Sequence, residues 1–553
     1  MATSAATNYK EIVDKAIKAI HERTFFAQYP EHPKAYGEEA PTKGLEAYNN
    51  HLGKSFSELL QQNPVAWAGE ETSPYTGKSL GITYPIFDVE TLVVRGGTAF
   101  SAWKKVSVDE RAEILIDALE RIKNRFFEMA YATQHTTGQS FIMSFQASGP
   151  HANDRALEAI AMGYEELNRF PSSVSWEKPM GKTSVKLDKT FKPIPKGIGL
   201  VIGCSTFPTW NSVPGLFASL ITGNTVIVKP HPKAVYPMAI VVAEIQNALK
   251  SKNINTNVCQ LAVDTSGNLI TRKLAEDPLV KLIDYTGGSS FGEFIESIKG
   301  KVTFTELTGV NSVIIDSVND LKAVTQNLAF AVSLYSGQMC TAPQNFFIPA
   351  GGVKQGDKVI PYEEVKKALV DAISGLVTHP QMGAGTLGAI QNEATLKRVH
   401  SMKNLDATML LNCVHVANPE FPDARTCSPI VFEVDAKDTG IYENELFGPI
   451  VLIIKTKDTA QSIALAKEMA IKHGAITFSA YTTDENTANI IFDELESAFT
   501  PVSLNLTGNV WVNQHATFSD FHVTGGNPAG NASFTNPEYV NKRFVWVGHR
   551  KAV

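Results

Sequence analysis

The sequence lacks the marks of several large protein classes. It contains no run of about 18 or more apolar residues, which an α-helix would need to cross a bilayer. Its 50 Lys and Arg residues stand against 56 Asp and Glu residues, a net charge of -6, so no basic surface for nucleic acid is expected. Residues 1–26 have no basic start followed by an apolar core, the pattern of a secretory signal. These absences predict a cytoplasmic protein with neither a nucleic-acid nor a membrane partner.

Cysteine and metal-binding patterns are also sparse. The five cysteines are scattered and none forms a CxxC pair, so neither a disulfide framework nor a structural zinc site is expected. The histidines form no HxH or HExxH group, and the sequence therefore predicts no metal site. A buried free thiol is the ordinary interpretation of most of these cysteines. Only Cys340 lies in a sequence context that indicates another role.

The sequence does contain a clear alternation of strands and helices. Short β-branched runs predict strands at 198–203, 225–228, 258–263, 280–286 and 302–307, with helices between them. A second series follows, with strands at 312–316 and 344–348 and a long helix to about residue 334. Such alternation with short connections predicts an α/β fold of parallel sheets covered by helices. Ligands of these sheets bind at the carboxyl ends of the strands, which places 203–208, 229–232 and 286–292 along one crevice.

Two segments before residue 195 have structural interpretations. Residues 1–70 read as irregular helical segments rich in Pro, Glu and His, an extension with too few apolar residues for a core of its own. Ser107-Val-Asp-Glu110 is a capping box, and the apolar stripe after it continues to Met129. This pattern predicts one amphipathic helix whose role is packing.

A glycine-rich turn, Tyr285-Thr-Gly-Gly-Ser-Ser-Phe-Gly292, follows a predicted strand and opens a predicted helix. Glycines let a phosphate approach the backbone, and a helix N-terminus offers unpaired N–H groups. The turn lacks the GxGxxG order, so a plain strand-to-helix connection is an equal alternative.

Cys340 and Glu306 are the two candidates for chemistry. Cys340 lies in Ser336-Gly-Gln-Met-Cys-Thr-Ala-Pro343, a loop context that can expose and activate a thiol, although a packed loop cysteine is the simpler alternative. Glu306 ends the apolar run VTFTEL, where an acid faces a crevice. It can serve there as an ion-pair partner or as a general base.

Five motifs in order resemble the aldehyde dehydrogenase family: GNTVIVKP (223–230), Tyr285–Gly292, Glu306-Leu-Thr-Gly309, Gly337-Gln-Met-Cys340 and Glu445-Leu-Phe-Gly-Pro449. The resemblance covers roughly 73–540 and implies two open parallel-sheet domains plus a small oligomerisation hairpin. It divides the chain into an extension (1–72), a cofactor-binding domain (73–308, with the hairpin at about 172–194), a catalytic domain (309–505) and a C-terminal return with an oligomerisation strand (506–553).

The resemblance implies that the Cys340 thiolate attacks an aldehyde and that Glu306 activates the water that hydrolyses the resulting thioester. The family stabilises the oxyanion with an asparagine, but Thr206 occupies that position here. A threonine hydroxyl can donate one hydrogen bond, and Asn211 is the alternative donor if the loop runs differently. Asn211 could instead merely begin the following helix.

The resemblance also implies a nicotinamide cofactor. Thr286, Gly287, Gly288 and Gly292 would accommodate its phosphates, Glu445 would hold the nicotinamide ribose and Phe447 would flank the ring. Members that prefer NAD carry a glutamate three positions after the lysine, but here that position is Pro232. A 2′-phosphate would then be tolerated beside Lys229 and His231, which favours NADP, or the use of both NADP and NAD.

Within the family, the extension and the C-terminal tail resemble the PaaN group of phenylacetic acid degradation proteins. This resemblance implies a semialdehyde from aromatic ring cleavage as the small-molecule substrate, free or carried as a CoA thioester. A CoA-acylating enzyme and a cofactor-binding scaffold without turnover are the alternatives. The resemblance further implies a homodimer or homotetramer, built by the hairpin and a C-terminal strand around 541–548.

Overall fold

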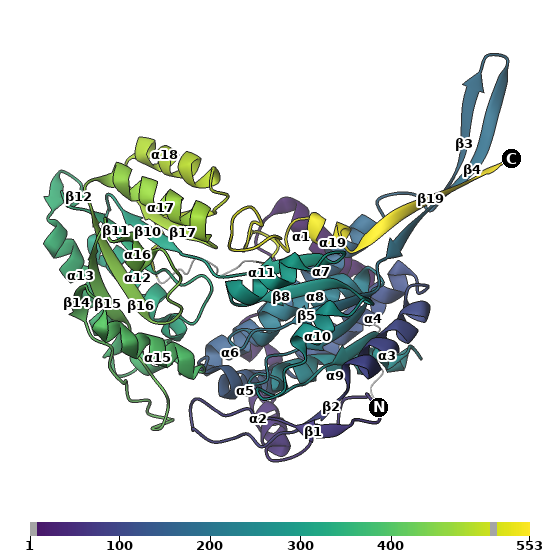
Figure 1. Cartoon of the computed structure of the whole chain (residues 1–553), viewed down its shortest axis with the longest axis horizontal. Helices are drawn as coiled ribbons and strands as arrows, with labels where there is room; N and C mark the ends of the chain where they lie inside the picture. The colour runs from purple at the N-terminus through teal and green to yellow at the C-terminus, as the bar shows by residue number, and fades with distance from the viewer. Residues whose placement is uncertain (1–7, 509–516) are drawn as a thin grey trace.

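The computed structural model describes residues 8–508 and 517–553 of the 553-residue chain. Residues 509–516, part of the predicted C-terminal return, lie outside the described residues. Figure 1 shows two lobes and a long arm that projects from one of them. Within the described ranges, no helix is long and apolar enough to cross a membrane.

The first lobe is built on a five-stranded sheet of order β7-β6-β5-β8-β9, in which every neighbouring pair is parallel. Its strands are β5 (Ile198–Ile202), β6 (Thr225–Lys229), β7 (Cys259–Leu261), β8 (Val280–Thr286) and β9 (Val302–Glu306). The connecting helices are α8 (Pro208–Ile221), α9 (Tyr236–Ser251), α10 (Thr271–Glu276) and α11 (Ser289–Ser297). The predicted parallel α/β sheet is confirmed.

Both faces of this sheet are covered, because successive side chains of a strand point to opposite sides. On one face Val226 and Val228 belong to the core that α8 and α9 cover. On the other, Ile227 and its neighbours pack against α3 (Val89–Trp103), α10 and α11. The central strand β5, IGLVI, is therefore apolar along its whole length, and β6 is apolar between Thr225 and Lys229, as in a buried parallel sheet.

The N-terminal extension forms α1 (Tyr9–Glu22) and α2 (Ala40–His51) and packs onto the first lobe. Ile12 and Val13 of α1 are buried in the same core as α7 (Pro150–Leu167). The extension thus shares the core of the lobe.

The predicted helix after the capping box is two helices. Ser107 Oγ accepts a hydrogen bond from the Glu110 N–H at 3.2 Å, as expected of the box, and α4 runs from Val108 to Lys123. Arg125 then leaves helical geometry, and α5 begins at Phe126 and ends at Thr137. Because the Arg125 guanidinium pairs with Glu128 and Glu244, this break is held in place. The prediction of one helix to Met129 was wrong.

The second lobe contains a seven-stranded sheet of order β14-β15-β16-β11-β10-β17-β18. Its strands are β10 (Ser312–Ile315), β11 (Asn345–Pro349), β14 (Thr408–Leu411), β15 (Ile430–Asp435), β16 (Ile450–Thr456), β17 (Phe478–Tyr481) and β18 (Val502–Leu504). The main helices are α12 (Leu321–Ser333), α13 (Tyr362–Val377), α17 (Thr459–His473) and α18 (Glu485–Glu496). The sheet is parallel apart from its edge strand β14.

The arm is a three-stranded antiparallel sheet of β3 (Ser173–Met180), β4 (Thr183–Pro195) and β19 (Phe544–Ala552). Figure 1 shows the C-terminal strand β19 lying along the hairpin and away from the two lobes. Arg543, fully buried just before β19, donates to Asp284 of β8 at 2.6 and 2.8 Å. This ion pair fixes the base of the arm to the sheet of the first lobe.

Candidate active site

The loop that carries Cys340 is held in an unusual backbone conformation. Tyr335 and Ser336, directly after α12, have φ values of 53° and 50°, a region that side chains other than glycine rarely adopt. Several hydrogen bonds hold this loop: among them, the Tyr335 hydroxyl donates to the Thr137 carbonyl, Gln338 donates to the Ala389 carbonyl, and Asn311 donates to the Cys340 carbonyl. A strained loop with so many partners keeps the thiol in one place.

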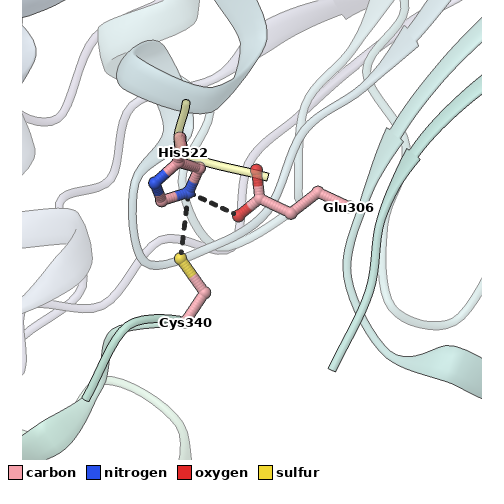
Figure 2. Close-up of side chains that lie close together, drawn as sticks. All are labelled: Glu306, Cys340 and His522. Atoms are coloured by element: carbon pink, nitrogen blue, oxygen red, sulfur yellow. Dashed lines mark hydrogen bonds and ion pairs between the residues drawn. The ribbon is translucent and has the colours of Figure 1, made fainter. Parts of the chain in front are cut away.

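His522 joins Cys340 and Glu306 into one cluster (Figure 2). Its Nε2 lies 3.5 Å from Cys340 Sγ and 3.2 Å from Glu306 Oε1. The imidazole is 1% exposed and packs edge-on against Trp210. Sequence reasoning missed His522, because a single histidine 182 residues from the cysteine carries no motif.

Glu306, at the end of β9, has three neighbours that favour its charged form. Burial acts to raise its pKa, but the hydrogen bond and charge of His522, the Cys340 thiol and the charge of Arg155 outweigh burial, so the pKa lies below its ordinary value. Asn211 Nδ2 also donates to Glu306 Oε2 at 3.2 Å. The site therefore contains a carboxylate available as a base at neutral pH.

The thiol of Cys340 is in the opposite situation. Burial, the neighbouring Glu306 carboxylate and Cys204 raise its pKa well above the ordinary value. The resting form is therefore the neutral thiol, and a base must take its proton before it can act as a nucleophile. Nε2 of His522 is placed to do so.

The structure separates the two candidates for the oxyanion donor. Asn211, in the first turn of α8, lines the same cavity as Cys340. Thr206 instead directs its hydroxyl to Cys204 Sγ, at 3.9 Å, and is absent from that cavity's wall. Because α8 begins at Pro208, the asparagine amide points into the site, and the threonine lies in the preceding loop.

The candidate residues for the adenosine end of a cofactor lie at the carboxyl ends of β6 and β7. Lys229 Nζ contacts Asp264 Oδ1 at 2.5 Å, and both side chains are buried. Burial and the charges of Lys229 and Lys233 lower the pKa of His231 to about 4, so its ring is neutral at pH 7. Sequence reasoning missed Asp264, since it belongs to no motif.

The glycine-rich turn fits a phosphate group. A Cβ on Gly288 would meet no atom within 4 Å, so the space before it is open. Gly288 precedes α11 without a side-chain cap, which leaves the first N–H groups of that helix for a ligand. Gly292 has another role, because a Cβ there would lie 2.1 Å from Leu307 Cδ2. Thr286 ends β8, and the Gly287 N–H donates to the Glu306 carbonyl at 3.0 Å.

Glu445 and Phe447 lie together near the Cys340 loop. Glu445 Oε1 accepts a hydrogen bond from the Gly309 N–H at 3.3 Å, and burial raises the pKa of this carboxyl to about 7. The Phe447 carbonyl accepts from Arg398 at 2.8 Å. A carboxyl that is half protonated at neutral pH can hold a ribose hydroxyl as a donor or as an acceptor.

A cavity of about 440 Å³ opens beside Cys340. Both lobes line it: α6 (Phe141–Ser148) and the first turn of α8 from one, and the segment from Phe330 to Thr341 from the other. Its apolar wall includes Met143, Phe207, Trp210, Leu334, Met339 and Met382. This cavity, called the substrate pocket below, gives a small molecule access to the thiol.

The cluster of Glu306, Cys340 and His522 also has the donor types that bind Zn²⁺. Their ligand atoms lie within 4.8 Å of one another, the one such group among the described residues. The three side chains already hydrogen-bond one another, an arrangement that suits proton transfer equally well. A metal-free protein stays a prediction.

Comparison with known proteins identifies the family. The model of the aldehyde dehydrogenase family matches residues 70–543. The chain belongs to the aldehyde dehydrogenase family. The crystal structure of an NAD-dependent aldehyde dehydrogenase from Burkholderia multivorans is 41% identical, covers 100% of both chains and superposes with a TM-score of 0.96. This dehydrogenase fold therefore extends over the whole chain, arm included.

More distant relatives share the fold. The alpha-ketoglutaric semialdehyde dehydrogenase of Bacillus subtilis (strain 168) is 22% identical over 436 residues, 76% of this chain and 82% of the relative. A 1-pyrroline-5-carboxylate dehydrogenase from Thermus, solved with bound NAD, is 19% identical and has a TM-score of 0.75, covering 96% of this chain and 99% of that one.

Proposed function

We propose that this aldehyde dehydrogenase oxidises an aldehyde to a carboxylic acid through a thioester on Cys340, with NAD(P) as oxidant. The observation that carries the proposal is the contact of His522 Nε2 with both Cys340 Sγ and Glu306 Oε1. Through this contact the imidazole of His522 is a base for the neutral Cys340 thiol, and the Glu306 carboxylate is the counter-charge of the imidazole once it is protonated. Both are needed for a buried cysteine to act as a nucleophile.

In the first step, His522 in the tautomer with its proton on Nδ1 takes the Cys340 proton on Nε2, and the sulfur attacks the aldehyde carbon. The imidazolium that forms is held by the Glu306 carboxylate 3.2 Å away. The tetrahedral oxyanion accepts a hydrogen bond from Asn211, the donor that lines the pocket. A nicotinamide cofactor held at the glycine-rich turn and by Glu445 would supply the two-electron oxidant that accepts the hydride of this carbon.

In the second step, the thioester is hydrolysed. Glu306, with its pKa below the ordinary value, takes a proton from water, which adds to the thioester carbon. The C–S bond then breaks, the carboxylic acid leaves, and Cys340 regains a proton. Asn211 keeps Glu306 oriented through the 3.2 Å hydrogen bond to Oε2.

For the cofactor we infer a preference for NAD over NADP, opposite to the preference that Pro232 suggests. Lys229 is already paired with the buried carboxylate of Asp264, and His231 is neutral, so neither offers a free positive charge to a 2′-phosphate. Asp264 would repel that phosphate and accept hydrogen bonds from ribose hydroxyls instead. The dehydrogenase from Burkholderia multivorans is NAD-dependent, which supports the same choice.

The aldehyde implied by the PaaN resemblance, a semialdehyde from phenylacetate ring cleavage, stays a prediction. CoA-acylating chemistry is the alternative, because thiolysis by CoA could replace hydrolysis of the same thioester. Glu306 speaks against it: a carboxylate beside the thioester serves water rather than a thiol. A scaffold without turnover is also less consistent with a nucleophile, base and donor gathered at one cavity.

The decisive experiment follows reduced cofactor on mixing enzyme, NAD or NADP and an aldehyde, with and without CoA. Cys340→Ala is expected to lower turnover by at least about 1000-fold. Glu306→Gln should release one burst of reduced cofactor per site and then stall, since thioester formation precedes the step that needs the base. Activity of Cys340→Ala equal to wild type would rule the mechanism out. Turnover only with CoA would transfer the assignment to the acylating class.

We also propose that the arm assembles this chain into a homodimer or homotetramer. Cross-strand pairing brings Trp176, Leu187 and Trp546 to one face of the arm, which lies clear of the two lobes in Figure 1. Apolar side chains on a projecting sheet are typical of an interface. Trp176→Glu is expected to lower the mass in sedimentation analysis, whereas Lys192→Glu on the opposite face of the arm is not.

A further inference from the structure

The substrate pocket has a composition that restricts which aldehydes it can take. Within the part of the chain that the structure describes, neither Lys nor Arg contributes to its wall, and the polar lining away from the reacting atoms consists of neutral Ser, Thr and Gln side chains, with Glu31 and His151 as the exceptions. The rest of the wall is mainly apolar. Met143 contributes to it from the first lobe and Leu334 from the second. Among the described residues of this wall, a carboxylate on the tail of a substrate would find no Lys or Arg to pair with.

The nearest guanidinium does not change this conclusion. Arg155 stacks on the Trp210 ring, with its central carbon 3.4 Å from the ring centroid, and is covered from the other side by Phe534 at 3.8 Å. Its Nε donates to the Trp210 carbonyl at 3.0 Å. The indole therefore separates Arg155 from the pocket, and the charge of the arginine acts on Glu306 instead.

The single acidic group of the wall outside the reacting cluster comes from the N-terminal extension. Glu31 Oε2 contacts His151 Nε2 at 2.8 Å, and the Glu31 side chain is 43% exposed. Residue 31 precedes the part of the chain that matches the family model, residues 70–543. Because this carboxylate already contacts His151, the histidine is not available as a partner for a carboxylate on the substrate.

We propose that the pocket selects aldehydes with an uncharged, apolar tail and rejects semialdehydes with a free carboxylate. The inference rests on the proposed function and names its substrate class. Two sources share this chemistry: a free aromatic or aliphatic aldehyde, and a semialdehyde whose acid end is masked as a thioester. In both, the tail that lies against Met143 and Leu334 is neutral.

The test compares four aldehydes with the wild-type enzyme: phenylacetaldehyde, succinic semialdehyde, its methyl ester and its CoA thioester. The ester and the free acid differ by one methyl group and one charge, so their ratio isolates the charge. We expect kcat/KM for the ester to exceed that for the acid by at least about 100-fold. Preference between phenylacetaldehyde and the CoA thioester then distinguishes the two sources. A free acid used as well as its ester would overturn the proposal.

Two variants test whether the discrimination between the acid and the ester arises at the pocket wall. Met143→Lys adds a cation of similar length and is expected to raise kcat/KM for the acid at least about tenfold relative to the ester, whereas Met143→Gln leaves the ratio unchanged. Glu31→Gln should raise the same ratio severalfold. An unchanged ratio in Met143→Lys would show that charge is not read at this wall.

The pocket can be tested even if no aldehyde is oxidised, an outcome that would end the proposed function alone. Phenylacetamide and phenylacetate have the same shape and differ in charge. The neutral amide is expected to protect Cys340 from alkylation by iodoacetamide, and the acid is not. Equal protection by both compounds would contradict the proposed selectivity independently of turnover.

Discussion

The cofactor crevice, at the carboxyl ends of β5, β6 and β8, and the substrate pocket meet at Cys340 and Glu306 but are built differently. The crevice consists of strand ends, backbone N–H groups of α11 and a buried ion pair, Lys229 with Asp264. The pocket consists of side chains from helices and loops far apart in the sequence, and no described residue of its wall is Lys or Arg. Backbone groups thus form much of the proposed cofactor surface, and side chains form the surface for the aldehyde.

The largest expected effect concerns the oxyanion at the junction of these two regions. Asn211→Ala should lower kcat by about 100- to 1000-fold, because it removes the hydrogen-bond donor of the pocket wall. Thr206→Ala should stay within about threefold of wild type, since its hydroxyl is directed to Cys204. Steady-state kinetics with a saturating cofactor measures both. A greater loss in Thr206→Ala would reassign the donor.

A smaller effect is expected from His522→Gln, about 100-fold in kcat/KM at neutral pH, with a change in pH dependence. His522 is the largest of the influences that lower the pKa of Glu306 against burial, so without it that pKa is expected to rise. Because Glu306 acts as a carboxylate, activity falls as pH drops through its pKa, and the acid limb of the profile should move to higher pH. The matched control is His549→Gln on the exposed arm. If the acid limb lay at the same pH in His522→Gln as in wild type, His522 would not be what lowers the pKa of Glu306.

The smallest effect should be confined to the crevice. Asp264→Asn frees Lys229 for a 2′-phosphate and is expected to tighten NADP relative to NAD by about tenfold. Dissociation constants from quenching of protein fluorescence measure this ratio without turnover, and Glu276→Gln on α10 is the control. If the ratio of the NADP and NAD dissociation constants were the same in Asp264→Asn as in wild type, residues other than Asp264 would determine the cofactor preference. Discrimination between the acid and ester substrates should stay as in wild type, because the pocket is untouched.

Much of the crevice could be predicted from the sequence. Parallel strands buried on both faces are continuous apolar runs, and their carboxyl ends, at residues such as Lys229 and Thr286, follow from the order of strands. The helix from Ser107 was located by its cap, but its end was not, because Arg125 at the break is also held by Glu58 and Glu244, which lie far away in the sequence and belong to no local pattern.

The rest of the site depends on contacts across long sequence separations. Cys340 and Glu306 were found by their motifs, whereas His522, Asp264 and Glu31 are single residues whose partners lie far along the chain or on another element. The choice between Thr206 and Asn211 depends on where α8 begins, a boundary that Pro208 fixes only within the fold. A cavity lined by single residues from separate elements produces no periodic pattern in the sequence from which it could be predicted.

The contribution of Glu31 to the pocket has a consequence for how enzymes of this kind can diverge. The nucleophile, its base and the cofactor crevice all lie within residues 70–543, but part of the wall that meets the substrate tail lies before them. Mutation or replacement of the extension can therefore change which aldehyde is accepted and leave the chemistry intact. Part of the specificity is thus carried by a different segment of the chain from the reactivity, and selection can act on one without disturbing the other.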